Sequence, residues 1–367
     1  MRLEDISVKD FTEEFKVIKK FDIEGEVSDI RPFGNGHINR TFLITTDKGR
    51  YVLQEINSNV FKKPREVMEN IINVTEYLKS VNEETLNFRR TLDGDILQES
   101  DGGYFRVYDM VEDTITYDTV ENADVFKSAG AAFGNFQNKL SGFDASVLHE
   151  TISRFHDTPN RYENFKKAVE GNIKDRLKDC EKEVAFVNDR AETFAKITEG
   201  IADGSVPLRV THNDTKLNNI LIDENTKKAR VVIDLDTIMP GSMLYDFGDA
   251  IRFGASTAAE DEKDIDKVHF DKELFRAYAD GFCNAVGSRM TEKEKELLPY
   301  SAYLMTMECG MRFLTDFLEG DTYFGTAYPT HNLVRCRTQF RLAKEMQEQK
   351  DEMLKIVYEV CGQSKIF

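Results

Sequence analysis

The feature that most constrains this chain is a short β-rich island set among long helical patterns. The island covers residues 206–237 and contains LRVTHND, NNILID, the polar turn ENTKK and ARVVIDLD in that order. Apolar runs separated by a polar turn predict strands joined by a hairpin. The chain after residue 112 is therefore predicted to be mostly helical, with one hairpin inside it. Its helical patterns, rich in Lys and Glu, lie roughly at 122–141, 161–200, 271–287, 292–319 and 333–360.

The first third of the chain has a different character. Between residues 26 and 110, short apolar strands such as TFLITT and YVLQEI alternate with turns such as DKGR. One amphipathic helix is predicted among them, because residues 67–78 carry apolar side chains at helical spacing. We therefore expect an α+β fold with two lobes. Residues 1–110 form a β-rich N-terminal lobe with one main helix, and residues 111–367 form a mostly helical C-terminal lobe that contains the hairpin.

Charge and composition exclude several kinds of partner. The formal net charge of −17 repels nucleic acid phosphates and anionic membranes at long range. The 5 cysteines are widely spaced and form no CxxC pair, which is typical of free thiols in a reducing cytoplasm. The N-terminal segment MRLEDISVKDFTEEF is acidic, and no apolar run approaches membrane-spanning length. We therefore expect a cytoplasmic protein with neither nucleic acid nor membrane as a partner. A monomer is the default expectation.

The predicted hairpin brings polar side chains together at one end. Asn219 stands at the start of its first strand and Asp234 at the end of its second. Antiparallel strands place such positions side by side. Asp214 lies in the turn just before Asn219, so two acids and an amide are expected in one small volume. Oxygen ligands of this kind suit Mg²⁺, which takes few protein carboxylates and prefers to keep waters and substrate phosphates.

The spacing of these residues resembles a known catalytic loop. His212-x-Asp214-x-Lys216-x-x-Asn219, followed by Asp234, is similar to the catalytic loop and metal-binding Asp of protein-kinase-like phosphotransferases. The resemblance implies that Asp214 is the catalytic base and that Asn219 and Asp234 bind Mg²⁺. Lys216 would lie near the charge of the transferring phosphoryl group, or would simply be an exposed lysine. His212 is expected to fix the loop.

Two further acids and a simpler interpretation remain open in this region. Asp236 and Asp246 are weaker candidates, either as carboxylates that support the site or as helix caps. The simpler interpretation is a polar strand-turn-strand whose Asn and Asp residues only cap turns, which is how most such residues are used. The joint match of His, Asp, Lys, Asn and a second Asp disfavours that interpretation.

The N-terminal lobe offers a candidate nucleotide site. The segment FGNGHIN lies between two predicted strands, and its Gly34, Asn35 and Gly36 would let backbone N–H groups approach the phosphates of ATP. In kinases a Lys on the following strand holds the α- and β-phosphates, but this chain has Gln54 there. A glutamine brings no charge, so Mg²⁺ and the loop backbone must contribute more to phosphate binding. Glu66 and Glu69 on the next helix would then lack the usual lysine partner.

At these residues the chain resembles the aminoglycoside-phosphotransferase and choline-kinase group. The resemblance implies ATP-dependent phosphorylation of the anomeric hydroxyl of N-acetylglucosamine or N-acetylgalactosamine, with ATP and Mg²⁺ as cofactors. The segments that carry it are GNGHINRTF at 34–42, YVLQEIN at 51–57, RVTHNDTKLNNIL at 209–221, VIDLDTIMPGSMLYDFGDAIRFGAS at 232–256 and ECGMRFLTDFLEGDTYF at 308–324.

The same resemblance implies where the substrates bind. The sugar pocket would be formed by Asp214, His37, Arg312 and Tyr323, and the adenine would lie at Asp109, Met110 and Val111. The residues alone also allow Arg312 to form a helix-surface salt bridge and Tyr323 to be a core aromatic residue with a solvated hydroxyl.

Two rival functions remain open at this stage. The first keeps the fold and changes the acceptor to an aminoglycoside, choline or a homoserine-like alcohol. An ammonium acceptor would need several carboxylates in its pocket, whereas His37, Arg312 and Tyr323 are neutral or cationic. The second is a non-catalytic nucleotide-binding scaffold, which the absence of the strand lysine would suggest. A scaffold has no need of Asp214, Asn219 and Asp234 together, so a kinase is the favoured prediction.

Overall fold

The computed structural model describes residues 11–34 and 38–362, and they divide into two compact units. The prediction divides the chain at one point, into lobes 1–110 and 111–367, whereas each unit is made of three separate segments. The division into these two lobes stays a proposal. The first unit comprises Met1–Ile115, Val147–Ile152 and Leu221–Met239, and the second comprises Thr116–Ser146, Ser153–Ile220 and Pro240–Phe367.

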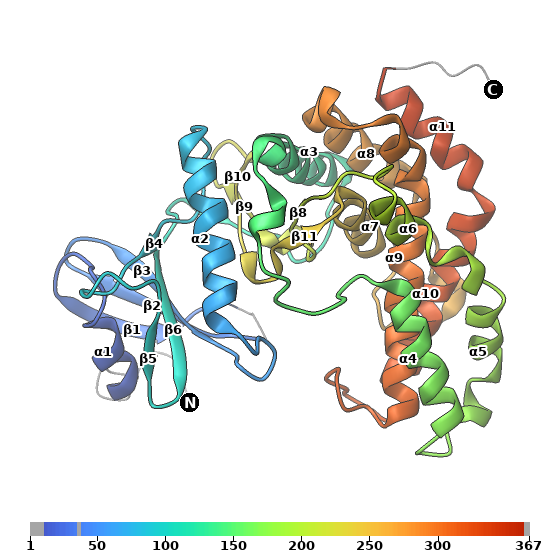
Figure 1. Cartoon of the computed structure of the whole chain (residues 1–367), viewed down its shortest axis with the longest axis horizontal. Coiled ribbons are helices and arrows are strands. Elements are labelled where there is room, and N and C mark those ends of the chain that lie inside the picture. The colour runs from blue at the N-terminus through green and yellow to red at the C-terminus, as the bar shows by residue number, and fades with distance from the viewer. Residues whose placement is uncertain (1–10, 35–37, 363–367) are drawn as a thin grey trace. The chain divides into compact units, whose positions relative to one another are not determined.

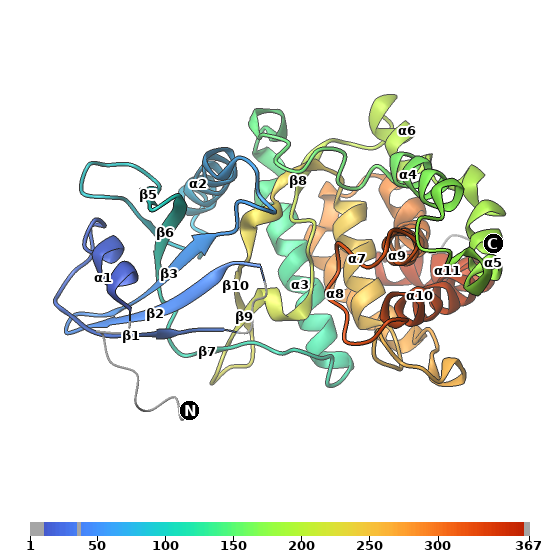
Figure 2. The ribbon, with the colours of Figure 1, turned by 90° about the horizontal axis from the view of Figure 1, so that it is seen from below.

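The first unit is built on an antiparallel sheet with the strand order β1-β2-β3-β6-β4, and β5 also pairs with β6 (Figures 1 and 2). The predicted helix is present as α2 and begins with a proline in its first turn, a favoured position. The elements are α1 (Thr12–Ile18), β1 (Val27–Pro32), β2 (Arg40–Thr46), β3 (Arg50–Ile56), α2 (Pro64–Ser80), β4 (Phe88–Arg89), β5 (Gln98–Ser100) and β6 (Gly103–Asp109).

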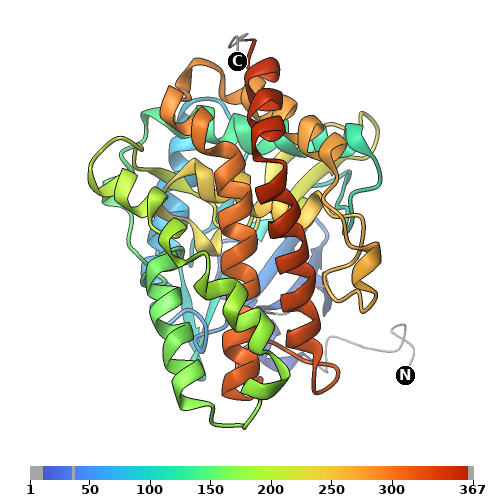
Figure 3. The ribbon, with the colours of Figure 1, turned by 90° about the vertical axis from the view of Figure 1, so that its right-hand side faces the viewer.

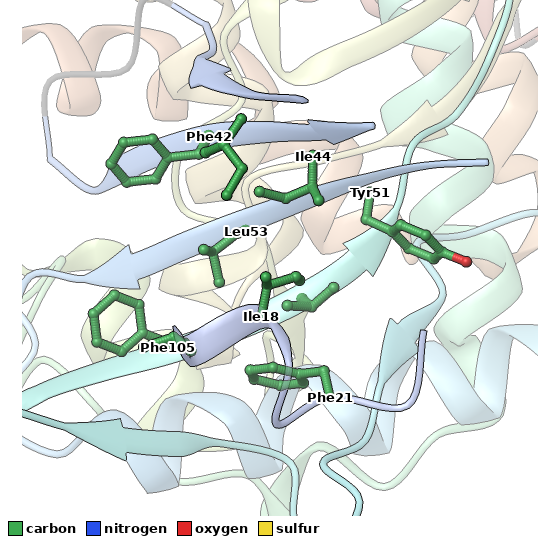
Figure 4. Packing of buried hydrophobic residues seen from close by; sticks show 10 residues of the cluster. Ile18, Phe21, Phe42, Ile44, Tyr51, Leu53 and Phe105 are labelled. Carbon is green, nitrogen blue, oxygen red and sulfur yellow. The ribbon is translucent and has the colours of Figure 1, made fainter. Parts of the chain in front are cut away.

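Side-chain alternation gives this sheet two different faces. Phe42, Leu53 and Phe105 point to one face and pack with Ile18 and Phe21, which form its hydrophobic core (Figure 4). Successive residues of a strand point to opposite faces, so the neighbouring positions on β3 and β6 face away from this core. That second face carries the polar side chains of Gln54 and Arg106, which lie opposite each other on β3 and β6.

The predicted hairpin is confirmed within the β-rich island. Strand β9 (Ile220–Asp223) lies between β10 (Ala229–Val232) and the short β7 (Thr114–Ile115). A single 3₁₀ turn, η8 (Leu235–Thr237), follows β10 directly. Asp234 precedes this turn with a left-handed backbone, φ 58° and ψ 57°.

The second unit is mostly helical, as predicted for this part of the chain (Figures 1 and 3). In Figure 3, α9, in orange, and α10, in red, run side by side. Its main elements are α3 (Ala123–Lys139), α4 (Thr158–Gly171), α5 (Glu181–Asn188), α6 (Lys196–Ala202), β8 (Arg209–Thr211), β11 (Met239–Gly241), α7 (Met243–Gly254), α8 (Lys272–Val286), α9 (Glu292–Glu319), α10 (His331–Glu348) and α11 (Lys350–Val360).

Two details of the helical prediction were wrong. The pattern at 161–200 is not continuous, because Asn172 adopts the left-handed conformation that ends α4, and α5 and α6 follow as separate helices. The helix α7 was not predicted at all. Almost all of its side chains are buried, including the charged residues Asp246, Asp249 and Arg252, which recur at helical spacing along it.

Close packing explains the glycine in the middle of α7. A Cβ atom at Gly248 would lie 2.4 Å from the carbonyl oxygen of Ser301, so only glycine allows α7 to pack against α9 at this distance. This packing matters because α7 carries Asp246 and Asp249. Within the described residues, no helix is long and apolar enough to cross a membrane.

Candidate active site

Asp246 anchors the predicted catalytic loop to α7. Its carboxylate accepts the backbone N–H groups of His212 at 3.0 Å and of Asn213 at 2.8 Å. It also accepts the side-chain amide of Gln137 at 2.8 Å, and the same amide donates to the carbonyl of Val210 at 2.9 Å. Asp246 is fully buried, and burial raises its pKa against the opposing effect of His212 and these hydrogen bonds. This carboxylate therefore holds the loop in place without lying on its surface.

His212 has the surroundings of a structural residue. It is fully buried, and its ring lies edge-on to Phe133 and Phe136 at centroid distances of 5.5 and 6.1 Å. Asn213, the next residue, adopts φ 66°, a left-handed conformation that Asn tolerates better than most residues. This turn directs the chain from β8 into the segment that carries Asp214.

Asp214, Lys216 and Asn219 lie together at the end of this loop. The ammonium of Lys216 is 2.8 Å from the Asp214 carboxylate, whose side chain is 25% exposed and so remains accessible to an acceptor. The Asn219 amide nitrogen donates to the carbonyl and to the carboxylate of Asp214, at 2.8 and 3.1 Å. Burial alone would lower the pKa of Lys216, but the Asp214 carboxylate outweighs it, so the pKa is raised. Lys216 is thus a charged partner of Asp214 and not a free surface lysine.

The same hydrogen bonds leave suitable atoms for a metal ion. Because the Asn219 nitrogen faces Asp214, its amide oxygen is the atom that remains to bind a cation. Asp234, in the first unit, follows β10 and is exposed to solvent. Carboxylate and amide oxygens fit Mg²⁺. The convergence of Asp234 with Asn219 stays a prediction.

The nucleotide-side residues are only partly described. Gly34 adopts φ 75°, and a Cβ there would meet no atom within 4 Å. Asn35, Gly36 and His37 lie outside the described residues. The Asp109 carboxylate is occupied by Arg89 at 2.6 Å and by Asn87 at 2.7 Å, which leaves backbone groups to contact an adenine.

Val111, Glu66 and Glu69 are also engaged within the first unit. The carbonyl of Val111 accepts the hydroxyl of Thr114 at 2.9 Å. Glu66 pairs with Lys63 at 2.9 Å, and Glu69 pairs with His149 at 2.8 Å. Both glutamates have therefore found partners other than a lysine on β3.

Gln54 does not point into solvent as a substitute phosphate ligand. Its amide oxygen accepts two hydrogen bonds from Arg106 on β6, at 2.9 and 2.8 Å, and its nitrogen donates to Thr41 at 3.1 Å. Arg106 in turn forms an ion pair with Asp236. Arg106 was missed by the sequence analysis, although an arginine in the middle of the apolar strand GYFRVYD was a signal that could have been noted.

Arg312 and Tyr323 line one cavity of about 250 Å³ in the second unit. The Arg312 guanidinium lies over the rings of Tyr323 and Phe324, at 5.8 and 5.4 Å from their centroids. The Nη2 atom of Arg312 also donates to the hydroxyl of Tyr323 at 3.5 Å. Tyr323 is 69% exposed and is therefore not a core residue.

Asp316 fixes the segment that carries Tyr323. Its buried carboxylate accepts the backbone N–H groups of Thr322 and Tyr323, both at 2.8 Å, and of Phe324 at 3.0 Å. It also accepts the Asn332 amide at 2.8 Å. No sequence signal singled out Asp316, because it lies inside a long helix among other charged residues.

Two further side chains of the second unit were not predicted. Arg161 on α4 lines the cavity of Arg312 and Tyr323, and burial together with the nearby Arg312 lowers the pKa of Arg161. His156 is buried and contacts the Glu308 carboxylate at 2.9 Å through Nδ1. Burial would raise the pKa of Glu308, but His156 outweighs it and the pKa is lowered.

Solved structures share the fold of the whole chain. A microcompartment-associated aminopropanol kinase is 16% identical, with a TM-score of 0.65, and the match covers 94% of this chain and 99% of that one. An aminoglycoside phosphotransferase from Alicyclobacillus acidocaldarius is 12% identical, with a TM-score of 0.60 and coverage of 94% and 96%. Spectinomycin phosphotransferase in complex with ADP and spectinomycin is 12% identical, with a TM-score of 0.53 and coverage of 95% and 98%.

These likenesses confirm the predicted α+β, protein-kinase-like fold. Residues 29–287 also match a family model described as the phosphotransferase enzyme family, which includes the segment with Asp214, Asn219 and Asp234. The chain therefore belongs to the phosphotransferase enzyme family.

Proposed function

We propose that this phosphotransferase transfers the γ-phosphoryl group of ATP to the anomeric hydroxyl of an N-acetylhexosamine, giving the sugar 1-phosphate. The observation that carries the kinase proposal is the Asp214 carboxylate, partly exposed and held by both Lys216 and Asn219. A carboxylate in this position accepts the proton of an attacking hydroxyl. An anomeric hydroxyl is more acidic than an ordinary alcohol, so a carboxylate is a sufficient base.

Each remaining residue has a stated role in this proposal. Asn219 and Asp234 would hold Mg²⁺, which neutralises charge on the β- and γ-phosphate oxygens when it is bound. Lys216 keeps its charge beside Asp214 and would lie near the charge of the transferring phosphoryl group. The spectinomycin phosphotransferase with bound ADP supports a nucleotide as the second ligand.

The charges around the Arg312 cavity favour a neutral acceptor over a cationic one. The cavity is lined by three cations, Arg161, Lys167 and Arg312, and by two acids, Asp316 and Glu319. The Asp316 carboxylate is already taken by backbone N–H groups, so Glu319 is the acid left to face a ligand. An ammonium group would meet net repulsion here, whereas sugar hydroxyls and an N-acetyl carbonyl accept hydrogen bonds from Arg and Tyr.

A panel of acceptors tests this proposal directly. ADP release should be followed with Mg-ATP and N-acetylglucosamine, N-acetylgalactosamine, glucose, choline, ethanolamine, aminopropanol and spectinomycin in turn. We expect turnover with one or both N-acetylhexosamines and little with the amines. Turnover of an amine alone would replace the sugar by the second candidate, a kinase of amino alcohols or aminoglycosides. No turnover and no nucleotide binding would leave only a scaffold.

Replacing Arg312 should weaken acceptor binding selectively. Arg312→Ala removes a charged donor from the cavity, so KM for the acceptor should rise about tenfold to a hundredfold. KM for ATP should change by less than about threefold, because nothing on the nucleotide side is altered. Arg190→Ala is the matched control, since Arg190 also lies over an aromatic ring, that of Phe186 at 3.6 Å, but does not line the cavity. Equal effects of both variants on acceptor KM would exclude Arg312 from the acceptor site.

Asp316→Ala should release the segment that Tyr323 belongs to. It leaves three backbone N–H groups without their acceptor. We expect acceptor KM to rise about tenfold and the free energy of unfolding to fall by about 2 kcal/mol. Steady-state kinetics and thermal melting check the two effects. Unchanged acceptor KM in a folded variant would show that the position of Tyr323 does not matter for acceptor binding.

A further inference from the structure

Arg106 occupies an unusual place for a charged residue. It lies in the middle of β6, directly opposite Gln54 on β3, and only 3% of it is exposed. Its strand neighbours Phe105 and Val107 belong to the hydrophobic core, so Arg106 points to the opposite face of the sheet. A buried charge of this kind is costly unless it is fully paired.

The pairing of Arg106 is complete and specific. Two of its nitrogens, Nε and Nη2, donate to the single amide oxygen of Gln54. The third, Nη1, donates to the Asp236 carboxylate, which is itself 3% exposed. The other oxygen of Asp236 accepts the Asn39 amide at 2.6 Å, and the Asn39 oxygen accepts the backbone N–H of Asn57 at 3.0 Å.

The hydrogen bonds of Arg106 explain why Gln54 stands where kinases have a lysine. Because both hydrogen bonds to the Gln54 oxygen come from Arg106, Gln54 orients the guanidinium and is not left to bind phosphate. Burial alone would lower the pKa of Arg106, but Asp236 outweighs it and the pKa is raised. A lysine at position 106 could not replace this arginine, since only the planar guanidinium reaches Gln54 and Asp236 together.

The network ends beside the predicted metal ligand. Asp234 is two residues before Asp236 and adopts φ 58° and ψ 57°. A left-handed conformation in a residue other than glycine is sparsely populated, and it persists only when its surroundings fix it. The ion pair of Asp236 with Arg106 fixes the segment immediately after it.

We propose that Arg106 is a positioning residue that, through Asp236, holds the turn at Asp234 in the conformation that binds Mg²⁺. This inference rests on the proposed kinase function, because it takes Asp234 as a metal ligand. It assigns Arg106 no contact with the nucleotide. The sheet thus keeps a positive charge, at Arg106, that holds the turn at Asp234 in place. It lacks only the lysine that would contact phosphate.

Two single substitutions separate positioning from direct phosphate contact. Arg106→Met and Asp236→Asn each break the pair, and binding of ADP is measured by calorimetry with Mg²⁺ and again with EDTA. If Arg106 acts by positioning, both variants weaken Mg-ADP binding by about tenfold and change metal-free ADP binding by less than about threefold. If Arg106 contacts phosphate, Arg106→Met weakens metal-free ADP binding, whereas Asp236→Asn frees the guanidinium and strengthens it. That opposite response would overturn the inference.

Thermal melting provides a readout that needs no ligand. Each single variant leaves one buried group without its charge partner, so its melting temperature should fall by about 10 °C. The double variant Arg106→Met/Asp236→Asn removes both charges and should regain at least about half of that loss. Equal or additive losses in the double variant would show that the two side chains are not coupled, which also contradicts the inference. The double variant remains available for this test where a single variant does not fold.

Arg176→Met is the matched control, since Arg176 pairs with Asp321 in the second unit. It should lower the melting temperature without changing the ratio of Mg-ADP to metal-free ADP affinity. If the wild-type protein binds no nucleotide under either condition, the proposed function fails. If the wild type binds Mg-ADP normally and Arg106→Met matches it, only the role of Arg106 fails.

Discussion

Asp214→Asn should lower kcat by about a thousandfold while leaving the protein folded. The amide has nearly the same shape as the carboxylate, but it cannot accept the proton of the acceptor hydroxyl. The side chain of Asp214 is 25% exposed, and its ion pair with Lys216 is therefore partly screened by solvent, so little stability is lost. Steady-state kinetics with the acceptor identified from the panel, together with thermal melting, measure both quantities.

The control for this variant is an exposed carboxylate without a proposed catalytic role. Asp203→Asn serves this purpose, because Asp203 only accepts hydrogen bonds from Ser205 in an exposed turn. Its kcat should equal that of the wild type. If Asp214→Asn keeps more than about a tenth of the wild-type kcat, Asp214 is not the base. Loss of folding in Asp214→Asn would instead assign Asp214 a structural role.

Local pattern was sufficient to predict many of the regular elements of this chain. Apolar spacing at residues 67–78 predicts α2, and the alternating strands with polar turns predict the sheet of the first unit and the β9–β10 hairpin. The helix α7 was not predicted. Its charged residues Asp246, Asp249 and Arg252 recur at helical spacing, but they are buried, so their spacing does not mark a solvent-facing surface.

In the candidate site, residues close together in the sequence could be predicted, whereas their distant partners could not. Asp214, Lys216 and Asn219 are within six positions of one another, so their proximity could be inferred from the sequence. The residues that anchor the catalytic loop, and those that anchor the turn at Asp234, are far away along the chain. Gln137 reaches Asp246 across 109 positions and Arg106 reaches Asp236 across 130. Nothing in a single sequence indicates such partners, because contacts between distant segments depend on the tertiary fold.

Gln54 shows how the tertiary partners change the interpretation of a residue. From the sequence alone, this glutamine is a weak substitute for a phosphate-binding lysine. In the structure its oxygen is used twice by Arg106, and the missing charge is present one strand away, paired with Asp236. Gln54 is therefore the hydrogen-bond partner of the Arg106–Asp236 ion pair, and the sheet keeps a cation on the neighbouring strand β6.

Asp246→Asn should have the largest effect on stability of any single substitution at the catalytic loop. One carboxylate oxygen accepts the N–H of Asn213, and the other accepts His212 and Gln137, so an asparagine would point its NH₂ group at a donor. An unsatisfied buried donor costs about 1–3 kcal/mol, and two donors meeting at this site should cost about 3 kcal/mol in the free energy of unfolding. Denaturant unfolding of the isolated variant measures this loss.

The same substitution should also reduce catalysis, although Asp246 does not contact the reacting groups. Its partners His212 and Asn213 directly precede Asp214, so a shift of the loop displaces the base and kcat should fall by at least about tenfold. Asp271→Asn is the control, because Asp271 also accepts two backbone N–H groups, at the exposed start of α8, where asparagine caps equally well. Since Asp214→Asn should lower kcat without lowering stability, a joint loss of both in Asp246→Asn distinguishes a residue that holds the base from the base itself. Wild-type stability and kcat in Asp246→Asn would show that the loop keeps its position without this anchor.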